Sequence, residues 1–169
     1  MSRESIVSFD VQPARSDDLA DVRSLMRAYQ LWLIEKLGVS LCFQDFDTEL
    51  AALPGAYVLP RGQLWIARDV NNATALGIIA VKPLDAFGEC ELKRLWVADF
   101  AKGRGAGRAL ANVAVDFARS AGYTTMKLDT LRDRMPAAIS LYRDLGFTET
   151  MGYVHNPEPD VLFMKLDLQ

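Results

Sequence analysis

The sequence has few of the residues that build metal centres and nucleophile sites. It contains one histidine and two cysteines among 169 residues, with no HExxH, CxxC or GxSxG motif. A zinc site of the usual Cys/His kind cannot be assembled from this set. The one imidazole, His155, lies in the segment His-Asn-Pro-Glu-Pro, which is typical of a loop. We therefore expect no metal and no serine-hydrolase chemistry.

Long apolar runs are missing as well. No run approaches the roughly 18 residues of a membrane span, and the start Met-Ser-Arg-Glu-Ser lacks the apolar segment of a signal peptide. Cys42 and Cys90 are expected to be free thiols, as in a reducing cytosol. With 50% apolar and 24% charged residues, the composition predicts one globular domain over residues 1–169. We predict a cytoplasmic protein with no membrane partner.

Charge of either sign is modest in sum but uneven along the chain. Nineteen Lys and Arg against 22 Asp and Glu give a net charge of −3, which disfavours a nucleic-acid partner. An RNA-binding domain is a weaker alternative, because no stacking aromatics are interleaved with the basic residues. Residues 92–108 nevertheless carry five basic side chains and one acidic side chain. Such a local positive patch suits a small anionic ligand. Its basic residues are Lys93, Arg94, Lys102, Arg104 and Arg108.

Hydrophobic periodicity predicts alternating strands and helices. Strands are expected at Ile6–Val11, Leu64–Arg68, Thr74–Val81, Glu89–Val97, Tyr123–Leu128 and Val161–Leu166. Helices are expected from Leu19 to Tyr29 with Ser16 as N-cap, at Leu31–Leu37 before Gly38, at Asp47–Leu53, from Gly107 to Gly122, and at Pro136–Leu145. This order predicts a single α/β (α+β) domain with a mixed sheet.

A glycine-rich loop lies between a predicted strand and a predicted helix. Its sequence is Lys102-Gly-Arg-Gly-Ala-Gly-Arg108. Glycines let a ligand approach the backbone, and the first amides of the following helix lack internal partners, so they bind anions. Arg104 and Arg108 can add charge-assisted hydrogen bonds. The loop is neither a Walker motif nor a dinucleotide GxGxxG motif, because Arg108 takes the third glycine position.

Three segments together resemble the GNAT superfamily of N-acetyltransferases. They are Glu91–Val97 (ELKRLWV), Lys102–Gly107 (KGRGAG) and Ala138–Phe147 (AISLYRDLGF). The phrases Phe43-Gln-Asp-Phe46 and Tyr153-Val-His-Asn-Pro157 resemble a bacterial branch of the superfamily whose acceptors the sequence does not specify. The resemblance implies a central, mostly antiparallel mixed sheet with splayed strands, flanked by helices.

The resemblance also implies that acetyl-CoA binds where the strand Glu89–Val97 splays from Tyr123–Leu128. Its pantetheine arm would pair with the backbone of Leu95, Trp96 and Val97. Two positions depart from the family pattern, because Lys102 replaces the usual Arg or Gln and Met135 replaces a cofactor-contacting Asn. The pyrophosphate would bind the loop formed by Lys102, Gly103, Arg104, Gly105, Ala106, Gly107 and Arg108.

Catalytic roles follow from the same resemblance. Glu91 matches the general base that makes the acceptor amine neutral, and Tyr142 matches the general acid that protonates the leaving thiolate. Glu89 lies two residues from Glu91 on the same strand face and is a substitute base. The structural alternatives are pairing of Glu91 with Lys93 or Arg94, and packing of Tyr142 in the core.

The amine acceptor is expected to lie against the first helices. Aromatic and acidic residues there favour a cationic amine, such as a polyamine, an aminoglycoside or a protein amino terminus, or else form a solvated face. We predict direct transfer in a ternary complex with acetyl-CoA as co-substrate. A non-catalytic acyl-CoA sensor is the alternative. Acceptor identity, acyl length and oligomeric state, a homodimer included, stay open. The acceptor-binding residues expected are Tyr29, Phe43, Asp45, Glu89 and Tyr153.

Overall fold

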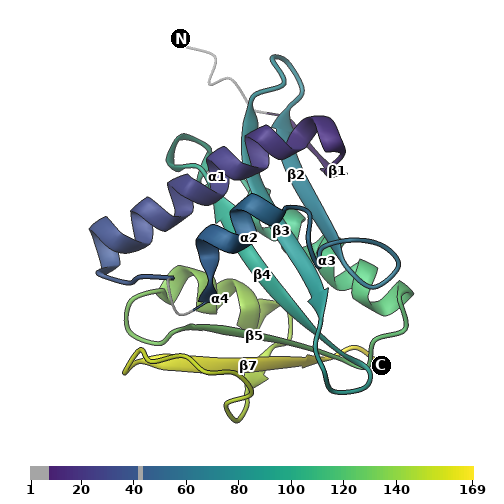
Figure 1. Cartoon of the computed structure of the whole chain (residues 1–169), viewed down its shortest axis with the longest axis vertical. Coiled ribbons are helices and arrows are strands. Elements are labelled where there is room, and N and C mark those ends of the chain that lie inside the picture. The colour runs from purple at the N-terminus through teal and green to yellow at the C-terminus, as the bar shows by residue number, and fades with distance from the viewer. Residues whose placement is uncertain (1–7, 42–43) are drawn as a thin grey trace.

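One mixed sheet organises the molecule. The computed structural model describes residues 8–41 and 44–169 (Figure 1). Within them, seven strands are ordered β1-β2-β3-β4-β5-β7-β6, and every neighbouring pair is antiparallel except β4 and β5. The predicted mixed, mostly antiparallel sheet is therefore confirmed. The strands are β1 (Phe9–Pro13), β2 (Gln63–Asp69), β3 (Ala75–Pro83), β4 (Glu89–Val97), β5 (Thr125–Leu131), β6 (Thr148–Glu149) and β7 (Val161–Asp167).

Helices cover both faces of this sheet. α1 and α2 pack on one face, where Val22, Met26 and Phe46 are buried against strand residues, whereas α3 and α4 pack on the other (Figure 1). Each helix presents one apolar stripe toward the sheet. These stripes pack on the strands and form two apolar cores, one on each face of the sheet. The helices are α1 (Leu19–Trp32), α2 (Phe46–Ala52), α3 (Ala106–Ser120) and α4 (Pro136–Asp144), with the short 3-10 helices η1 (Ser16–Asp18) and η4 (Asp99–Ala101) and the π-helical segment η2 (Leu33–Leu37), which continues α1.

Most element types are confirmed, and the differences lie at element ends. Ser16 is not the N-cap of α1, because it lies in η1, where Asp18 accepts a hydrogen bond from the Arg15 amide at 2.8 Å. Gly38 ends η2 as predicted, with a φ of 66° that favours glycine. The first strand is shifted from its predicted range, and it includes Pro13, which an edge strand tolerates. Residues 6 and 7 of that range lie outside the described residues.

A bulge in β4 opens the sheet beside β5. The two strands pair in parallel only from Glu89 to Glu91 of β4, and they then diverge, as Figure 1 shows. Arg94 has a φ of 59°, and the register shift between β3 and β4 places Arg94 and Leu95 together opposite Ile79. A bulge bends its strand and increases its twist. The splay predicted between these strands is therefore present, and it leaves one side of Leu95–Val97 without a partner strand.

Candidate active site

Two adjoining cavities occupy the splay between β4 and β5. The loop cavity, of about 400 Å³, is lined by the glycine loop, the end of β4 and the start of α4. The polar cavity, of about 110 Å³, lies deeper between the two strands. The two cavities adjoin, because they share four lining residues, Tyr29, Leu95, Met135 and Ala138.

The loop cavity ends at the N-terminus of α3. Gly103 and Gly105 adopt φ values of 77° and 86°, and a Cβ built on either residue would meet no atom within 4 Å. The Ala109 amide is bonded to the Gly105 carbonyl at 3.0 Å, so the three amides before it precede the intrahelical ladder. Open space, free amides and the positive end of a helix dipole together form a site for an anion.

The aromatic wall of the loop cavity holds Lys102. Its Nζ lies 4.6 Å from the ring centre of Trp96 and 5.1 Å from that of Trp32, and it pairs with Asp99 at 2.7 Å. Cation–π contacts of this kind hold the ammonium group of a lysine against the aromatic rings. Lys102 therefore stands at the mouth of the loop cavity.

The predicted positive patch is not one surface, which corrects the expectation from sequence. Lys93 and Arg94 line the polar cavity, whereas Lys102 lines the loop cavity and Arg108 pairs on the surface with Asp144 at 2.8 Å. The reason is the bulge in β4, at which Arg94 pairs with Glu49 of α2 and Lys93 contacts Gln44, the second residue before α2. An anionic ligand at the glycine loop would therefore meet only part of the patch.

Tyr142 of α4 lines the polar cavity. Its side chain is 7% exposed, and its ring packs 5.7 Å from that of Phe147. Burial raises the pKa of its phenol, and Tyr29 and Asp129 raise it further. The phenol is therefore protonated at neutral pH and can donate a proton into the cavity.

Glu91 lies behind the cavity wall and lines neither cavity. Its carboxylate is 1% exposed, and Tyr153 donates a hydrogen bond to Oε2 at 2.6 Å. The Nζ atoms of Lys82 and Lys93 lie 3.8 and 3.7 Å from Oε1. Burial and the Glu91 charge raise the pKa of Tyr153, which thus remains a hydrogen-bond donor. Glu91 reaches the cavity through Lys93, so its role as base stays a prediction.

Arg94 is held by a buried network on the α2 side of the cavity. Its Nε and Nη2 donate to the two carboxylate oxygens of Glu49 at 2.8 and 3.0 Å, and Tyr57 donates to Glu49 Oε1 at 2.8 Å. The guanidinium also lies 4.8 Å from the ring centre of Phe46. These contacts join β4 to α2 and keep the bulge in place.

Asp129 is the carboxylate that sequence reasoning missed. It lies in β5 on the cavity, beyond the predicted strand end at Leu128, and Asn156 donates to its Oδ2 at 2.9 Å. The signal available in the sequence was an acidic residue following an apolar strand next to the Glu91 strand. Asn156 itself belongs to the Tyr153–Pro157 phrase, and its Oδ1 accepts the amide of Glu158 at 3.0 Å.

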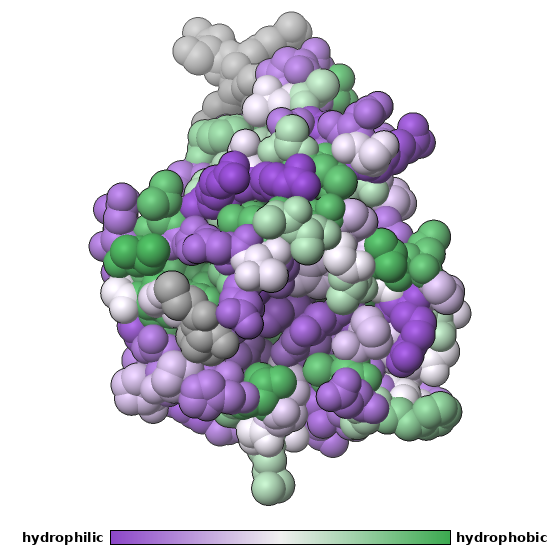
Figure 2. Space-filling view, viewed as in Figure 1, coloured by the Kyte–Doolittle hydropathy of each residue, from purple (hydrophilic) through white to green (hydrophobic). Residues whose placement is uncertain are grey.

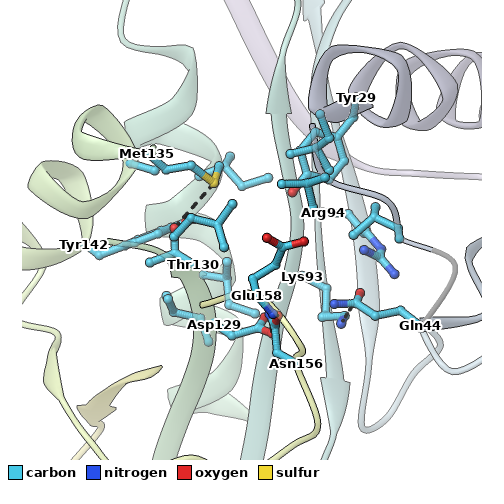
Figure 3. Close-up of a pocket in the computed structure, with 18 residues that line it drawn as sticks. Tyr29, Gln44, Lys93, Arg94, Asp129, Thr130, Met135, Tyr142, Asn156 and Glu158 are labelled. Carbon is cyan, nitrogen blue, oxygen red and sulfur yellow. Dashed lines mark hydrogen bonds between the residues drawn. The ribbon is translucent and has the colours of Figure 1, made fainter. Parts of the chain in front are cut away.

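Figure 3 shows how these side chains face one another. Tyr142, Thr130 and Met135 lie on one side of the cavity, Arg94, Lys93 and Gln44 lie on the other, and Asp129 and Asn156 lie between them. Thr130 Oγ1 lies 3.6 Å from Met135 Sδ. Hydrophobic and charged groups therefore surround one small space.

The residues expected to bind the acceptor are only partly brought together. Tyr29 lines both cavities, but Asp45 is exposed at the N-cap of α2 and Glu89 pairs with Lys127 at 2.8 Å. Tyr153 contacts Glu91 instead of the cavity. Phe43 lies outside the described residues. Gln44, from the same phrase, lines the polar cavity and accepts a hydrogen bond from Lys93 Nζ at 3.0 Å.

The site thus combines a parallel strand pair that opens onto a glycine loop at a helix N-terminus with a cavity lined by a protonated phenol. The Acetyltransferase (GNAT) family matches residues 23–147, and the chain belongs to that family. The chain is 38% identical over 151 residues to an uncharacterized N-acetyltransferase of Schizosaccharomyces pombe, covering 89% of each protein. The protein is therefore an N-acetyltransferase.

Solved structures support the fold. A GNAT-family acetyltransferase from Staphylococcus aureus matches with a TM-score of 0.77 at 17% identity, covering 96% of this chain and 100% of that one. The yncA acetyltransferase of Salmonella typhimurium, solved with its cofactor acetyl-CoA, matches with a TM-score of 0.73 at 23% identity, covering 95% and 94%. Identities this low establish shared architecture alone.

Neither a metal-binding cluster nor a membrane-spanning helix is present in the described part of the chain. Residues 8–41 and 44–169 contain no group of three or more His, Cys, Asp or Glu side chains placed to hold a metal ion. In the same residues, no helix is both long enough and apolar enough to span a bilayer.

On the face in Figure 2, apolar side chains lie near the end of α1 and η2, where Leu31 and Ile34 are exposed.

Proposed function

We propose that this protein moves the acetyl group of acetyl-CoA to the primary amine of a small molecule or protein by direct transfer in a ternary complex. The observation that carries the proposal is that the cavity at the glycine loop adjoins the polar cavity in the splay between β4 and β5. The first cavity suits an anionic cofactor and the second suits a polar acceptor. Direct transfer is supported by the two adjoining cavities and by the burial of Cys90, the one cysteine among the described residues.

The residues present fit acetyl-CoA. β3 pairs with β4 at Trp96 and Val97, and the opposite edge of β4 is open toward β5, so Leu95–Val97 can pair with the amides of a pantetheine arm. The backbone from Gly103 to Arg108 can hold the pyrophosphate at the α3 N-terminus. When bound there, acetyl-CoA supplies an activated acetyl group.

Proton movement falls to side chains at the polar cavity. Tyr142 is the proposed acid, because its phenol is neutral and lines the cavity. Three carboxylates are candidates for the base: Asp129, Glu91 and Glu89. Asp129 lines the cavity, and Glu91 is separated from it by Lys93, so Glu91 would act through a water or through that lysine. Glu89 is the weakest of the three, since it is paired with Lys127 outside both cavities.

The proposal is tested by acetyl-CoA binding and by thiol release. Isothermal calorimetry is expected to show binding of acetyl-CoA, and free thiol is expected to accumulate only when an acceptor amine is added. Acetyl-CoA binding without thiol release across a broad panel of amines would instead favour an acyl-CoA sensor. No binding of acetyl-CoA at all would reject both functions.

A further inference from the structure

The polar cavity is lined by four charged side chains that differ in how their charge is balanced. Arg94 is paired with Glu49, and Glu158 is paired with Arg134, whose guanidinium also bonds Asp160. Glu49 of α2 therefore balances one cation, and Arg134, which lines the loop cavity, balances one anion. The other two charged side chains that line the cavity are Lys93 and Asp129.

Lys93 has a neutral hydrogen-bond partner. Its side chain is 11% exposed, and among the described residues its Nζ donates a hydrogen bond to the amide oxygen of Gln44 at 3.0 Å. Glu91 lies 3.7 Å away, beyond hydrogen-bond distance, and it is shared with Lys82. Burial lowers the pKa of Lys93, as does the charge of Arg94, while Glu91 and Asp129 oppose that shift. An anion placed in the cavity would supply the missing hydrogen-bond acceptor.

Asp129 is the counterpart on β5. Its assigned partner is again a neutral amide, because Asn156 Nδ2 donates to Oδ2 at 2.9 Å. Asn156 is fixed in this role by the Glu158 amide, which donates to its Oδ1. One cation on β4 and one anion on β5 thus face the same small cavity, each held by a side-chain amide and neither given a full ion pair inside the cavity (Figure 3).

We propose that the acceptor is a small zwitterion of the amino-acid type, whose carboxylate binds Lys93 and whose ammonium group binds Asp129. The inference rests on the proposed function, because it names the acceptor for the same cleft. A cavity of about 110 Å³ admits a small molecule and excludes a folded chain. A polyamine would bring a second positive charge beside the buried side chains of Lys93 and Arg94, where like charges repel more strongly than in water.

The placement also suits transfer. An ammonium group bound to Asp129 would share the polar cavity with Tyr142, since both side chains line it. Loss of the ammonium proton to the carboxylate would leave a neutral amine lone pair next to the proposed acid. Binding by Lys93 at the other end orients the acceptor, which is a large part of the advantage of a bound substrate.

The test compares each protein amino acid with its carboxamide as acceptor, using saturating acetyl-CoA and detection of free thiol. The carboxamide keeps the amine and removes the carboxylate charge. We expect kcat/KM to be about 10- to 100-fold higher for the preferred free amino acid, the scale of a charge-assisted hydrogen bond. Spermidine, as a polycation without a carboxylate, is expected to be a poorer acceptor still.

Variants then locate the discrimination. Lys93→Met is expected to reduce the ratio between acid and carboxamide to about 2-fold, whereas Lys93→Arg, which keeps the charge, is expected to retain most of it. The matched control is Lys165→Met, which removes a lysine of β7 that pairs with Asp167 and lines neither cavity. Should Lys93→Met fail to fold, calorimetry of the acid and carboxamide on the wild-type protein with CoA gives the same comparison.

The outcomes are separable. Faster turnover of carboxamides, plain amines or spermidine would overturn the zwitterion proposal and leave the N-acetyltransferase proposal intact. An unchanged preference in Lys93→Met would overturn the role of that lysine. Acetyl-CoA binding with no turnover of any amine would overturn both proposals.

Discussion

Removing the hydroxyl of Tyr142 separates chemistry from binding at this site. In Tyr142→Phe the ring keeps its packing against Phe147, and in the described residues no hydrogen bond is assigned to the lost hydroxyl. The fold and the loop cavity are therefore expected to be unchanged. What is lost is a proton donor at the polar cavity, where the departing thiolate needs one.

The expected magnitude follows from that role. General acid catalysis contributes about 10²- to 10⁴-fold, so turnover should fall by at least about 10²-fold, or roughly 2.7 kcal/mol of transition-state free energy. The dissociation constant of acetyl-CoA should change by less than about 2-fold, because the hydroxyl does not line the loop cavity. Burial raises the pKa of Tyr142, so the wild-type acid stays protonated, and turnover should show no loss from its deprotonation below pH ~10.

The assay is steady-state thiol release, with acetyl-CoA binding measured separately by calorimetry. Tyr123→Phe is the matched control: it removes a tyrosine hydroxyl that donates to the Arg61 carbonyl at 2.7 Å and lies outside both cavities. That variant should keep wild-type turnover. Wild-type turnover in Tyr142→Phe would contradict the role of Tyr142 as general acid. The proton would then come from another donor at the cavity.

Three further predictions concern the base, the loop and the α2 network. Asp129→Asn is expected to lose most turnover near pH 7 and to regain part of it at high pH, where the acceptor amine is already neutral, whereas Glu91→Gln should show this pattern only if the base acts through a relay. Gly105→Asp is expected to weaken acetyl-CoA binding by about tenfold or more in calorimetry, while Gly122→Asp, at the same φ of 86° and also in open space, should bind normally. Glu49→Gln should lower the free energy of unfolding in urea by about 2 kcal/mol, since it removes the charge paired with a buried guanidinium, and a loss below about 0.5 kcal/mol would show that the network contributes little to stability.

Local sequence rules predicted the elements well because each element obeys them separately. The apolar stripe of α1, the glycine at the end of η2 and the alternation of β4 are all properties of one segment. The glycine loop was likewise predictable, since its anion site needs only a strand, a few glycines and a helix start. The end of β5 was not, because Asp129 is a polar residue that remains in the strand by pairing with Phe163 of β7. That pairing joins segments over 30 residues apart.

The same contrast between patterns within one segment and contacts between distant segments explains which site residues the sequence predicted. The sequence displays the charges of Lys93, Arg94 and Glu91 but not their partners, and the partner decides which charge is left to bind a ligand. Arg94 pairs with a glutamate 45 residues away, and Glu91 accepts a hydrogen bond from a tyrosine 62 residues away. Buried charges must be paired or hydrogen-bonded, so these distant contacts engage Glu91, the expected base, and Arg94, a member of the expected positive patch. The two charges proposed for chemistry at the cavity, Lys93 and Asp129, are those whose hydrogen bonds run to neutral side-chain amides, with Glu91 lying 3.7 Å from Lys93 as an ion pair beyond hydrogen-bond distance.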